Sequence, residues 1–237
     1  MKYAIIAAGK GSRLRSEGIK EPKPLIKMGN ETLIERLINI FIKNEATEII
    51  IIVNEDTPYT IKTVKEIAAN KIVPIQIIKQ STPSSMHSFY AISSLLEKEP
   101  FIMTTIDTVF KEDDFSNYVK SFKEELLKGT KALMGVTDYI DDEKPLYINT
   151  DKYYNITGFY DQNDTNMSLI SAGVYGLTPE TLKTLDKCIK TGQSRMRNFQ
   201  RAIVNSKMKI KAFVFNKVID IDHKDDIIKA KHLIGVK

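Results

Sequence analysis

An apolar run near the N-terminus opens directly into a glycine-rich, cationic stretch. Residues 2–8 read Lys-Tyr-Ala-Ile-Ile-Ala-Ala, and residues 9–13 read Gly-Lys-Gly-Ser-Arg. The run predicts a buried strand, and the glycines predict a tight turn whose backbone N–H groups face an anion. Arg13 and Lys23 add positive charge that N–H groups lack. The stretch therefore predicts a loop that binds phosphate.

Two other phosphate-binding loops fit this stretch poorly. A P-loop requires Gly-x-x-x-x-Gly-Lys-Ser/Thr, and no segment of the chain has that pattern. A dinucleotide-binding loop requires a third glycine where this chain has Leu14, and a later acidic residue for which Glu31 or Glu35 fits weakly. The loop is therefore of another kind.

The order Ala-Ala-Gly-x-Gly-x-Arg followed by Pro-Lys-Pro-Leu resembles the signature of the sugar-1-phosphate nucleotidylyltransferases and related GT-A-like NTP transferases. The resemblance implies an enzyme that joins an NTP to a phosphorylated small molecule, above all a sugar-1-phosphate, and releases pyrophosphate. It implies catalytic roles for Arg13, Lys23 and Asp107. It also implies that the NTP is bound by the loop residues Ala7, Ala8, Gly9, Lys10, Gly11 and Ser12.

Strand-like and helix-like segments alternate along the chain. Strands are expected at residues 2–8, 48–53, 72–79, 101–106, 130–136 and 168–177, and helices at 32–41, 59–70, 84–96, 113–127 and 225–233. In the first helix, Leu33, Leu37, Ile38 and Phe41 share one face. The pattern predicts an α/β fold with a doubly wound, mainly parallel, Rossmann-like sheet and helices on both faces. Residues 145–150 and 154–160 predict a small β-hairpin with its turn at 151–153.

We expect a single domain over residues 1–237, in which residues 1–110 bind the NTP and residues 111–237 bind the acceptor. Asp107 follows a predicted strand, where it could hold Mg²⁺ or cap the next turn. The resemblance favours the metal. The segment Val-Ile-Asp-Ile-Asp-His of 218–223 resembles the family's closing motif, so Asp220, or Asp222 close behind it, is the expected second metal ligand. The alternative is that Asp222 caps the following helix and Asp220 faces solvent.

Several segments between these carboxylates are candidates for substrate binding. By resemblance, Gln80, Ser84 and Ser85 hold the nucleobase and ribose, although the two serines could simply cap a helix. Residues 171–173 resemble the family's Asn-Ala-Gly strand, which makes Gly173 a candidate. The family's Glu-Lys-Pro segment corresponds to residues 161–163, where Gln162 replaces the lysine that meets the acceptor phosphate. Arg195 and Arg197 could replace that charge, or could be surface arginines.

Composition limits the partners. Lys and Arg are scattered, and the net charge of +5 is mild, so no nucleic-acid partner is expected. The chain has one cysteine, Cys188, and no apolar run of the ~18–20 residues that span a membrane, so a soluble cytoplasmic protein without a membrane partner is expected. Whether copies form a homo-oligomer stays open.

Two alternatives to a sugar-1-phosphate enzyme remain. One is a CTP-dependent cytidylyltransferase acting on phosphocholine or another non-sugar phosphate. A carboxylate-lined pocket rich in tyrosine would favour it, because aromatic faces bind quaternary amines. The other is a non-catalytic, nucleotide-binding regulatory protein, because fold alone does not guarantee turnover.

Overall fold

The expected alternation of strands and helices is present in the computed structural model, which describes residues 1–141, 143–163 and 167–236. The strands are β1 (Lys2–Ala7), β2 (Lys27–Met28), β3 (Glu31–Thr32), β4 (Glu48–Val53), β5 (Ile75–Lys79), β6 (Phe101–Thr105), β7 (Thr108–Phe110), β8 (Ala132–Thr137), β9 (Tyr147–Thr150), β10 (Ile156–Tyr160), β11 (Leu169–Leu177), β12 (Ile210–Phe215) and β13 (Val218–Asp220). The helices are α1 (Ser12–Ser16), α2 (Leu33–Lys43), α3 (Pro58–Ala69), α4 (Ser85–Ile92), α5 (Glu112–Leu127), α6 (Glu180–Lys190), α7 (Met196–Asn205) and α8 (Lys224–Ile234), with 3-10 turns at Lys23–Leu25 and Ser93–Leu95.

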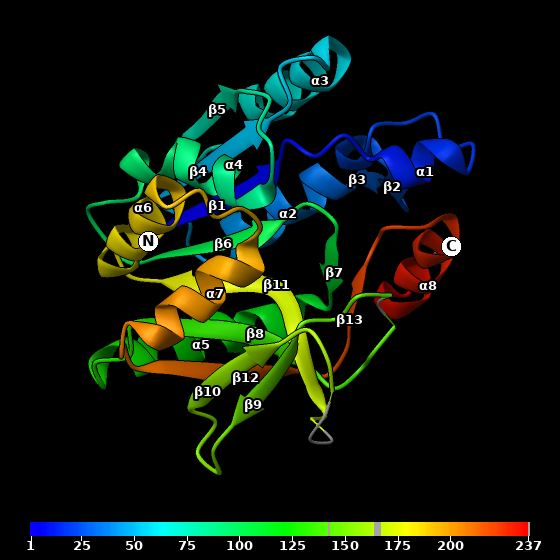
Figure 1. Cartoon of the computed structure of the whole chain (residues 1–237). Helices are drawn as coiled ribbons and strands as arrows, with labels where there is room; N and C mark the ends of the chain where they lie inside the picture. Colours follow the sequence, from blue (N-terminus) through cyan, green and yellow to red (C-terminus); the bar gives the residue numbers. More distant parts are fainter. Residues whose placement is uncertain (142, 164–166, 237) are drawn as a thin grey trace.

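One large sheet runs through the molecule, in the order β10-β9-β11-β6-β1-β4-β5, and β8 and β12 continue from β11 (Figure 1). Strands β6, β1, β4 and β5 are parallel, as are β8 and β12. Strand β11 is antiparallel to β6, β8 and β9, so the sheet is mixed. The expected α/β fold is confirmed, including the small antiparallel hairpin, which is formed by β9 and β10. Carboxyl ends of β1, β4 and β6 consequently meet at one edge.

The central strand β1 is buried on both faces because its side chains alternate between two hydrophobic clusters. Tyr3 and Ile5 belong to the cluster that includes side chains of α2, α3 and α5. Ala4 and Ile6 belong to the cluster that includes side chains of α4, α6 and α7. A strand covered on both faces reads as a continuous apolar run rather than an alternating one, which is why residues 2–8 look uniformly apolar.

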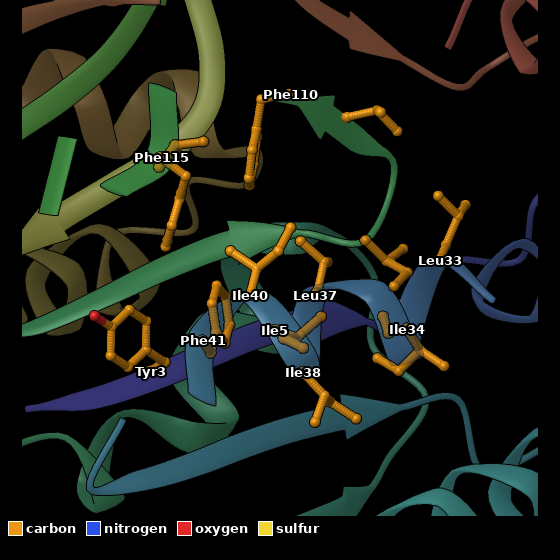
Figure 2. Close-up of a cluster of buried hydrophobic side chains, with 14 of the residues drawn as sticks. Tyr3, Ile5, Leu33, Ile34, Leu37, Ile38, Ile40, Phe41, Phe110 and Phe115 are labelled. Atoms are coloured by element: carbon orange, nitrogen blue, oxygen red, sulfur yellow. The ribbon is translucent and has the colours of Figure 1, made fainter. Parts of the chain in front are cut away.

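Helix α2 presents the apolar face that its periodicity predicts. Leu33, Leu37, Ile38 and Phe41 are each at most 3% exposed. The Phe41 ring lies against that of Tyr3 on β1, with ring centroids 4.6 Å apart (Figure 2). The Thr32 side chain accepts a hydrogen bond from the Glu35 N–H and so begins the helix. The expected side of α2 therefore packs on the sheet.

Two expected boundaries lie three or more residues from the observed ones, each for a local reason. The third strand begins at Ile75 rather than at residue 72, because Pro74 lacks the N–H that a ladder needs and Ile72 is exposed. The helix expected over 84–96 ends at Ile92, and the Ser93 hydroxyl donates to the Tyr90 carbonyl. None of the helices in the described ranges combines the length and apolar character that crossing a membrane requires.

The aromatic group around Phe115 gives a test of the core. The Phe115 side chain is fully buried, and its ring stacks on Phe41 and Phe110 at centroid distances of 5.5 and 4.9 Å. We expect Phe115→Ala to lower the free energy of unfolding by about 3–5 kcal/mol, because it leaves a cavity and removes ring contacts. Urea denaturation would measure the loss. The control Leu127→Ala, at a side chain that is 91% exposed, should change stability by less than about 0.5 kcal/mol.

Candidate active site

The glycine-rich loop forms one wall of a cavity at the carboxyl end of β1. The cavity has a volume of about 360 Å³ and is lined by residues 8–11, Lys23, the entry to α4 at residues 82–85, and Asp107. Gly11 adopts a φ of +60°, which glycine tolerates without strain. Of the predicted loop residues, Ala8, Gly9, Lys10 and Gly11 line the cavity. Ala7 points into the core, and Ser12 begins the exposed helix α1.

A short antiparallel ladder brings the C-terminal motif to Asp107. Strand β7 follows Asp107 and pairs with β13, in the register Thr108 opposite Asp220. One further hydrogen bond extends the ladder: the Ile221 N–H donates to the Asp107 carbonyl at 3.0 Å. Residues 220–222 therefore lie beside Asp107 although more than a hundred positions separate them.

Lys23 links the two carboxylate segments. Its Nζ lies 3.0 Å from Asp107 Oδ2 and 3.0 Å from Asp222 Oδ1, and the lysine side chain is only 11% exposed. Asp222 Oδ2 in turn lies 2.6 Å from Arg13 Nη1. The structure thus brings together Arg13, Lys23, Asp107 and Asp222. The Asp222 carboxylate does not cap α8, whose N-cap residue is His223.

Charge rather than burial decides the ionisation of this cluster. Burial by itself lowers the pKa of Lys23, but the charges of Asp107 and Asp222 outweigh it and hold the pKa above its usual value. Burial likewise raises the pKa of Asp107, but Lys23 and a hydrogen bond from Thr105 outweigh it and hold this pKa below its usual value. Both groups are therefore charged near neutral pH.

Asp220 approaches the same cluster from β13. Burial is the main cause that raises the pKa of the Tyr175 hydroxyl, and the charges of Asp220 and Asp107 raise it further. The negative charges of Asp220 and Asp107 therefore both favour the protonated form of the Tyr175 hydroxyl. The sequence left the choice between Asp220 and Asp222 open. In the structure, Asp222 contacts Lys23 directly, and Asp220 lies opposite Thr108 in the β7–β13 ladder.

A second cavity adjoins the cluster on the side of β8, β11 and α8. Its volume is about 260 Å³, and Arg13, Asp220 and Asp222 lie on its wall. Six carboxylates face it, those of Asp141, Glu143, Asp220, Asp222, Asp225 and Asp226, together with the basic side chains of Arg13, His223 and Lys229. The cluster of Lys23, Asp107 and Asp222 thus lies between two hollows.

The predicted residues at the start of α4 divide between two places. Ser84 and Ser85 line the 360 Å³ cavity, and Ser84 Oγ also accepts hydrogen bonds from the N–H groups of His87 and Arg195. Capping and cavity lining therefore coexist at Ser84. Gln80 lies instead on the wall of a neighbouring hollow between α4 and α6.

Arg195, Arg197 and Gly173 each have local constraints that the sequence did not predict. Arg195 is exposed and adopts a φ of +74°, which is strained for a residue with a side chain. Arg197 is ion-paired with Asp161 and donates to the Lys144 carbonyl at 3.1 Å, so its charge is already partly neutralised. Gly173, with a φ of +67°, packs on Thr105 and Thr108, and a Cβ there would collide with both hydroxyls.

The carboxylates of the site suit a hard divalent cation. Among the residues that the structure describes, no group of three or more His, Cys, Asp or Glu side chains is arranged to hold a metal. Mg²⁺ needs only one or two protein carboxylates, because it keeps waters and takes phosphate oxygens. Asp107 with Asp220 or Asp222 supplies that donor set, and the Lys23 ammonium between two of them marks a place that favours positive charge.

Sequence comparison assigns nearly the whole chain to one family. The family model described as nucleotidyl transferase matches residues 2–235. The chain is also similar to a probable mannose-1-phosphate guanylyltransferase 1 of rice, Oryza sativa subsp. japonica, with 23% identity over 192 residues. This match covers 78% of the chain but 52% of the rice protein, so the chain spans about half the length of that relative.

Solved structures of low sequence identity share the fold. The inositol-1-phosphate CTP transferase from T. maritima superposes with a TM-score of 0.78 at 19% identity, covering 100% of this chain and 97% of that one. A UDP-glucose pyrophosphorylase complexed with UDP-glucose gives 0.77 at 17% identity, covering 98% and 97%. At these identities the likeness shows the fold alone.

The depressed pKa of Asp107 predicts a pH dependence of stability. Below its usual pKa of 3.8, the unfolded chain binds a proton that the native carboxylate does not, so the free energy of unfolding rises with pH in this range. We expect Asp107→Asn to reduce that rise between about pH 2 and 5. Lys23→Met should also reduce it, because it removes the charge that lowers the pKa. Urea unfolding at several pH values would measure the slope, and an unchanged slope in both variants would contradict the prediction.

Proposed function

This chain belongs to the nucleotidyl transferase family, and we propose that it transfers a nucleotidyl group from an NTP to a phosphorylated small molecule, with a sugar-1-phosphate as the leading acceptor. The products are an NDP-activated metabolite and pyrophosphate. One observation carries the proposal: Lys23 is held between Asp107 and Asp222 where two cavities adjoin. One cavity has the glycine-rich loop as its wall, and the other lies on the acceptor half of the chain.

The 360 Å³ cavity is the proposed NTP site. Backbone N–H groups of residues 9–12 bind the triphosphate, and the Arg13 guanidinium neutralises the β- and γ-phosphates and the departing pyrophosphate. The Arg13 side chain is 51% exposed, so it is free to move from Asp222 to a phosphate. Ser84 and Ser85 contact the nucleoside, and Gln80 does so from the adjoining hollow.

The reaction is an in-line attack by an acceptor phosphate oxygen on the α-phosphorus, which forms one P–O bond and breaks the bond to pyrophosphate. Both reactants are anions, so positioning and neutralisation of charge dominate the barrier. Lys23 lies between the α-phosphate and the acceptor phosphate and neutralises the charge that develops there. No general base is required, because the acceptor phosphate is ionised near pH 7.

Asp107, with Asp220 or Asp222, is the proposed Mg²⁺ site. When bound, Mg²⁺ supplies positive charge that orients the α-phosphate and helps it accept electron density. The chain's own contribution is to hold Asp107 ionised through Lys23, and to bring residues 220–222 beside it through the β7–β13 ladder.

Names of the similar proteins support a sugar or polyol phosphate as acceptor, since they refer to mannose-1-phosphate, inositol-1-phosphate and UDP-glucose. They refer to different nucleotides, so the base is not assigned. With Arg197 bound to Asp161, Arg195 is the better candidate for the charge that Gln162 lacks. The Arg195 N–H donates to Ser84 Oγ, and Ser84 lines the 360 Å³ cavity, whereas Arg195 itself is not among the described residues that line either cavity.

A second candidate is a cytidylyltransferase whose acceptor phosphate carries a cationic amine. The lining of the 260 Å³ cavity favours it, because six carboxylates outnumber three basic side chains and the excess negative charge would attract an amine at the end away from the phosphate. Among the six, Asp222 is already paired with Arg13 and Lys23. Asp141 and Asp226 are already paired with Lys229.

Tyr139 lines this cavity, and the Lys217 ammonium already lies over its ring, 3.7 Å from the centroid, so this ring supports the amine acceptor only weakly. Tyr147, Tyr153, Tyr154, Tyr160 and Tyr175, the tyrosines available from the sequence, are absent from its described lining.

The direct test is release of pyrophosphate with Mg²⁺ across CTP, UTP, GTP, ATP and dTTP, each paired with sugar-1-phosphates, inositol-1-phosphate and phosphocholine. We expect turnover with one pair and its loss in Asp107→Asn, because the substitution removes a carboxylate of the metal site. Turnover with phosphocholine alone would favour the amine acceptor. Binding of an NTP without turnover in any pair would favour the non-catalytic, regulatory alternative.

Lys23→Ala tests the role of the lysine. We expect kcat to fall by about 10²-fold or more, the range for removing one group that stabilises charge in the transition state. Lys27→Ala is the matched control, because Lys27 is exposed on β2 outside both cavities. Equal kcat values for the two variants would remove Lys23 from the reaction.

A further inference from the structure

The helix that carries Arg13 buries few apolar side chains. Helix α1 is five residues long, and Leu14 is its buried residue, at 2% exposure. Ser12, Arg13, Arg15 and Ser16 are exposed. An isolated helix of this length is not stable in water, so contacts with other segments must set its position.

Glu17, which directly follows α1, makes two such contacts with the other end of the chain. Its Oε1 lies 2.5 Å from His223 Nδ1. Its Oε2 accepts a hydrogen bond from the Lys224 N–H at 2.7 Å. Lys224 is the first residue of α8, so this N–H has no partner within its own helix, and the carboxylate also gains from the helix dipole.

The residues that receive Glu17 are themselves held in place. Asp226 Oδ2 accepts hydrogen bonds from the N–H groups of Asp222 and His223, at 3.1 and 2.8 Å. His223 Nε2 also lies 3.4 Å from Glu143 Oε1. The backbone at residues 222–224 therefore offers α1 a fixed support, and the neighbouring Asp222 carboxylate contacts Arg13 and Lys23.

We propose that Glu17 is a positioning residue, which fastens α1 to the first turn of α8 and thereby holds Arg13 at the phosphate end of the site. Glu17 lines neither cavity, so it acts through the placement of Arg13 and is not a catalytic residue. The inference rests on the proposed function for the role of Arg13. The Glu17 contact itself rests on the two distances to His223 and Lys224.

Inorganic pyrophosphate with Mg²⁺ is a suitable probe, because it carries the phosphates that Arg13 is proposed to meet and binding needs no turnover. By calorimetry, we expect Glu17→Ala to weaken pyrophosphate binding about 10-fold, within the range for groups coupled in one network. Glu17→Gln should retain most of the affinity, because its amide oxygen still accepts from the Lys224 N–H. Glu21→Ala is the matched control, since Glu21 is an exposed carboxylate in the same segment.

An Arg13→Ala background separates positioning from general loss of structure. If Glu17 acts through Arg13, adding Glu17→Ala to Arg13→Ala should weaken binding by less than about 2-fold further. An equal 10-fold loss in both backgrounds would overturn the proposal. So would wild-type affinity in Glu17→Ala, or a loss in Glu21→Ala as large as that in Glu17→Ala.

Hydrogen exchange tests the contact without any ligand. We expect faster amide exchange over residues 12–20 in Glu17→Ala than in the wild type, with Glu21→Ala unchanged, because α1 loses its support. Unchanged exchange over residues 12–20 would overturn the proposal. Failure of pyrophosphate to bind even the wild type would instead count against the proposed function, so the two failures are distinguishable.

Discussion

The ammonium group of Lys23, held between Asp107 and Asp222, is the interaction on which the rest of the site depends. The three residues come from a 3-10 turn, the exit of β6 and the segment before α8. A partly buried charge is costly when it is alone, so each member requires the others. The trio therefore ties the N-terminal loop to the C-terminal motif and keeps charged groups concentrated where the two cavities adjoin.

The mixed sheet creates the space around that trio. Parallel strands β6, β1 and β4 end at one edge, where the glycine-rich loop and Asp107 line the 360 Å³ cavity. The antiparallel strand β11 joins β6 to β8 and β9. Its pairing with β8 shifts register between Ser171 and Tyr175, around Gly173, whose φ of +67° and close approach to Thr105 and Thr108 leave no room for a side chain. Gly173, which the family resemblance suggested as a substrate-binding residue, is therefore also required for packing. Its contact with a substrate stays a prediction.

Much of the fold could be predicted from local sequence, because periodicity reports burial directly. The apolar run of β1, the buried face of α2 and the β9–β10 hairpin follow from patterns within a dozen residues. Lys23 and Asp107 were predicted as members of one site, and the structure joins them at 3.0 Å. The pairing of Arg197 with Asp161 and the contact of Glu17 with His223 were not predicted, since no local pattern encodes a partner distant in sequence.

By itself, the sequence determined the class of fold, the glycine-rich loop that follows the first strand, and the family to which the chain belongs. Those properties depend on short motifs and on the periods of strands and helices, which any window of the chain displays. Only the tertiary structure decided which carboxylate meets Lys23, which arginine is paired with Asp161, and which glutamate contacts the start of α8. The β7–β13 ladder and the packing of α8 set these contacts, because they determine which distant side chains come within hydrogen-bonding distance.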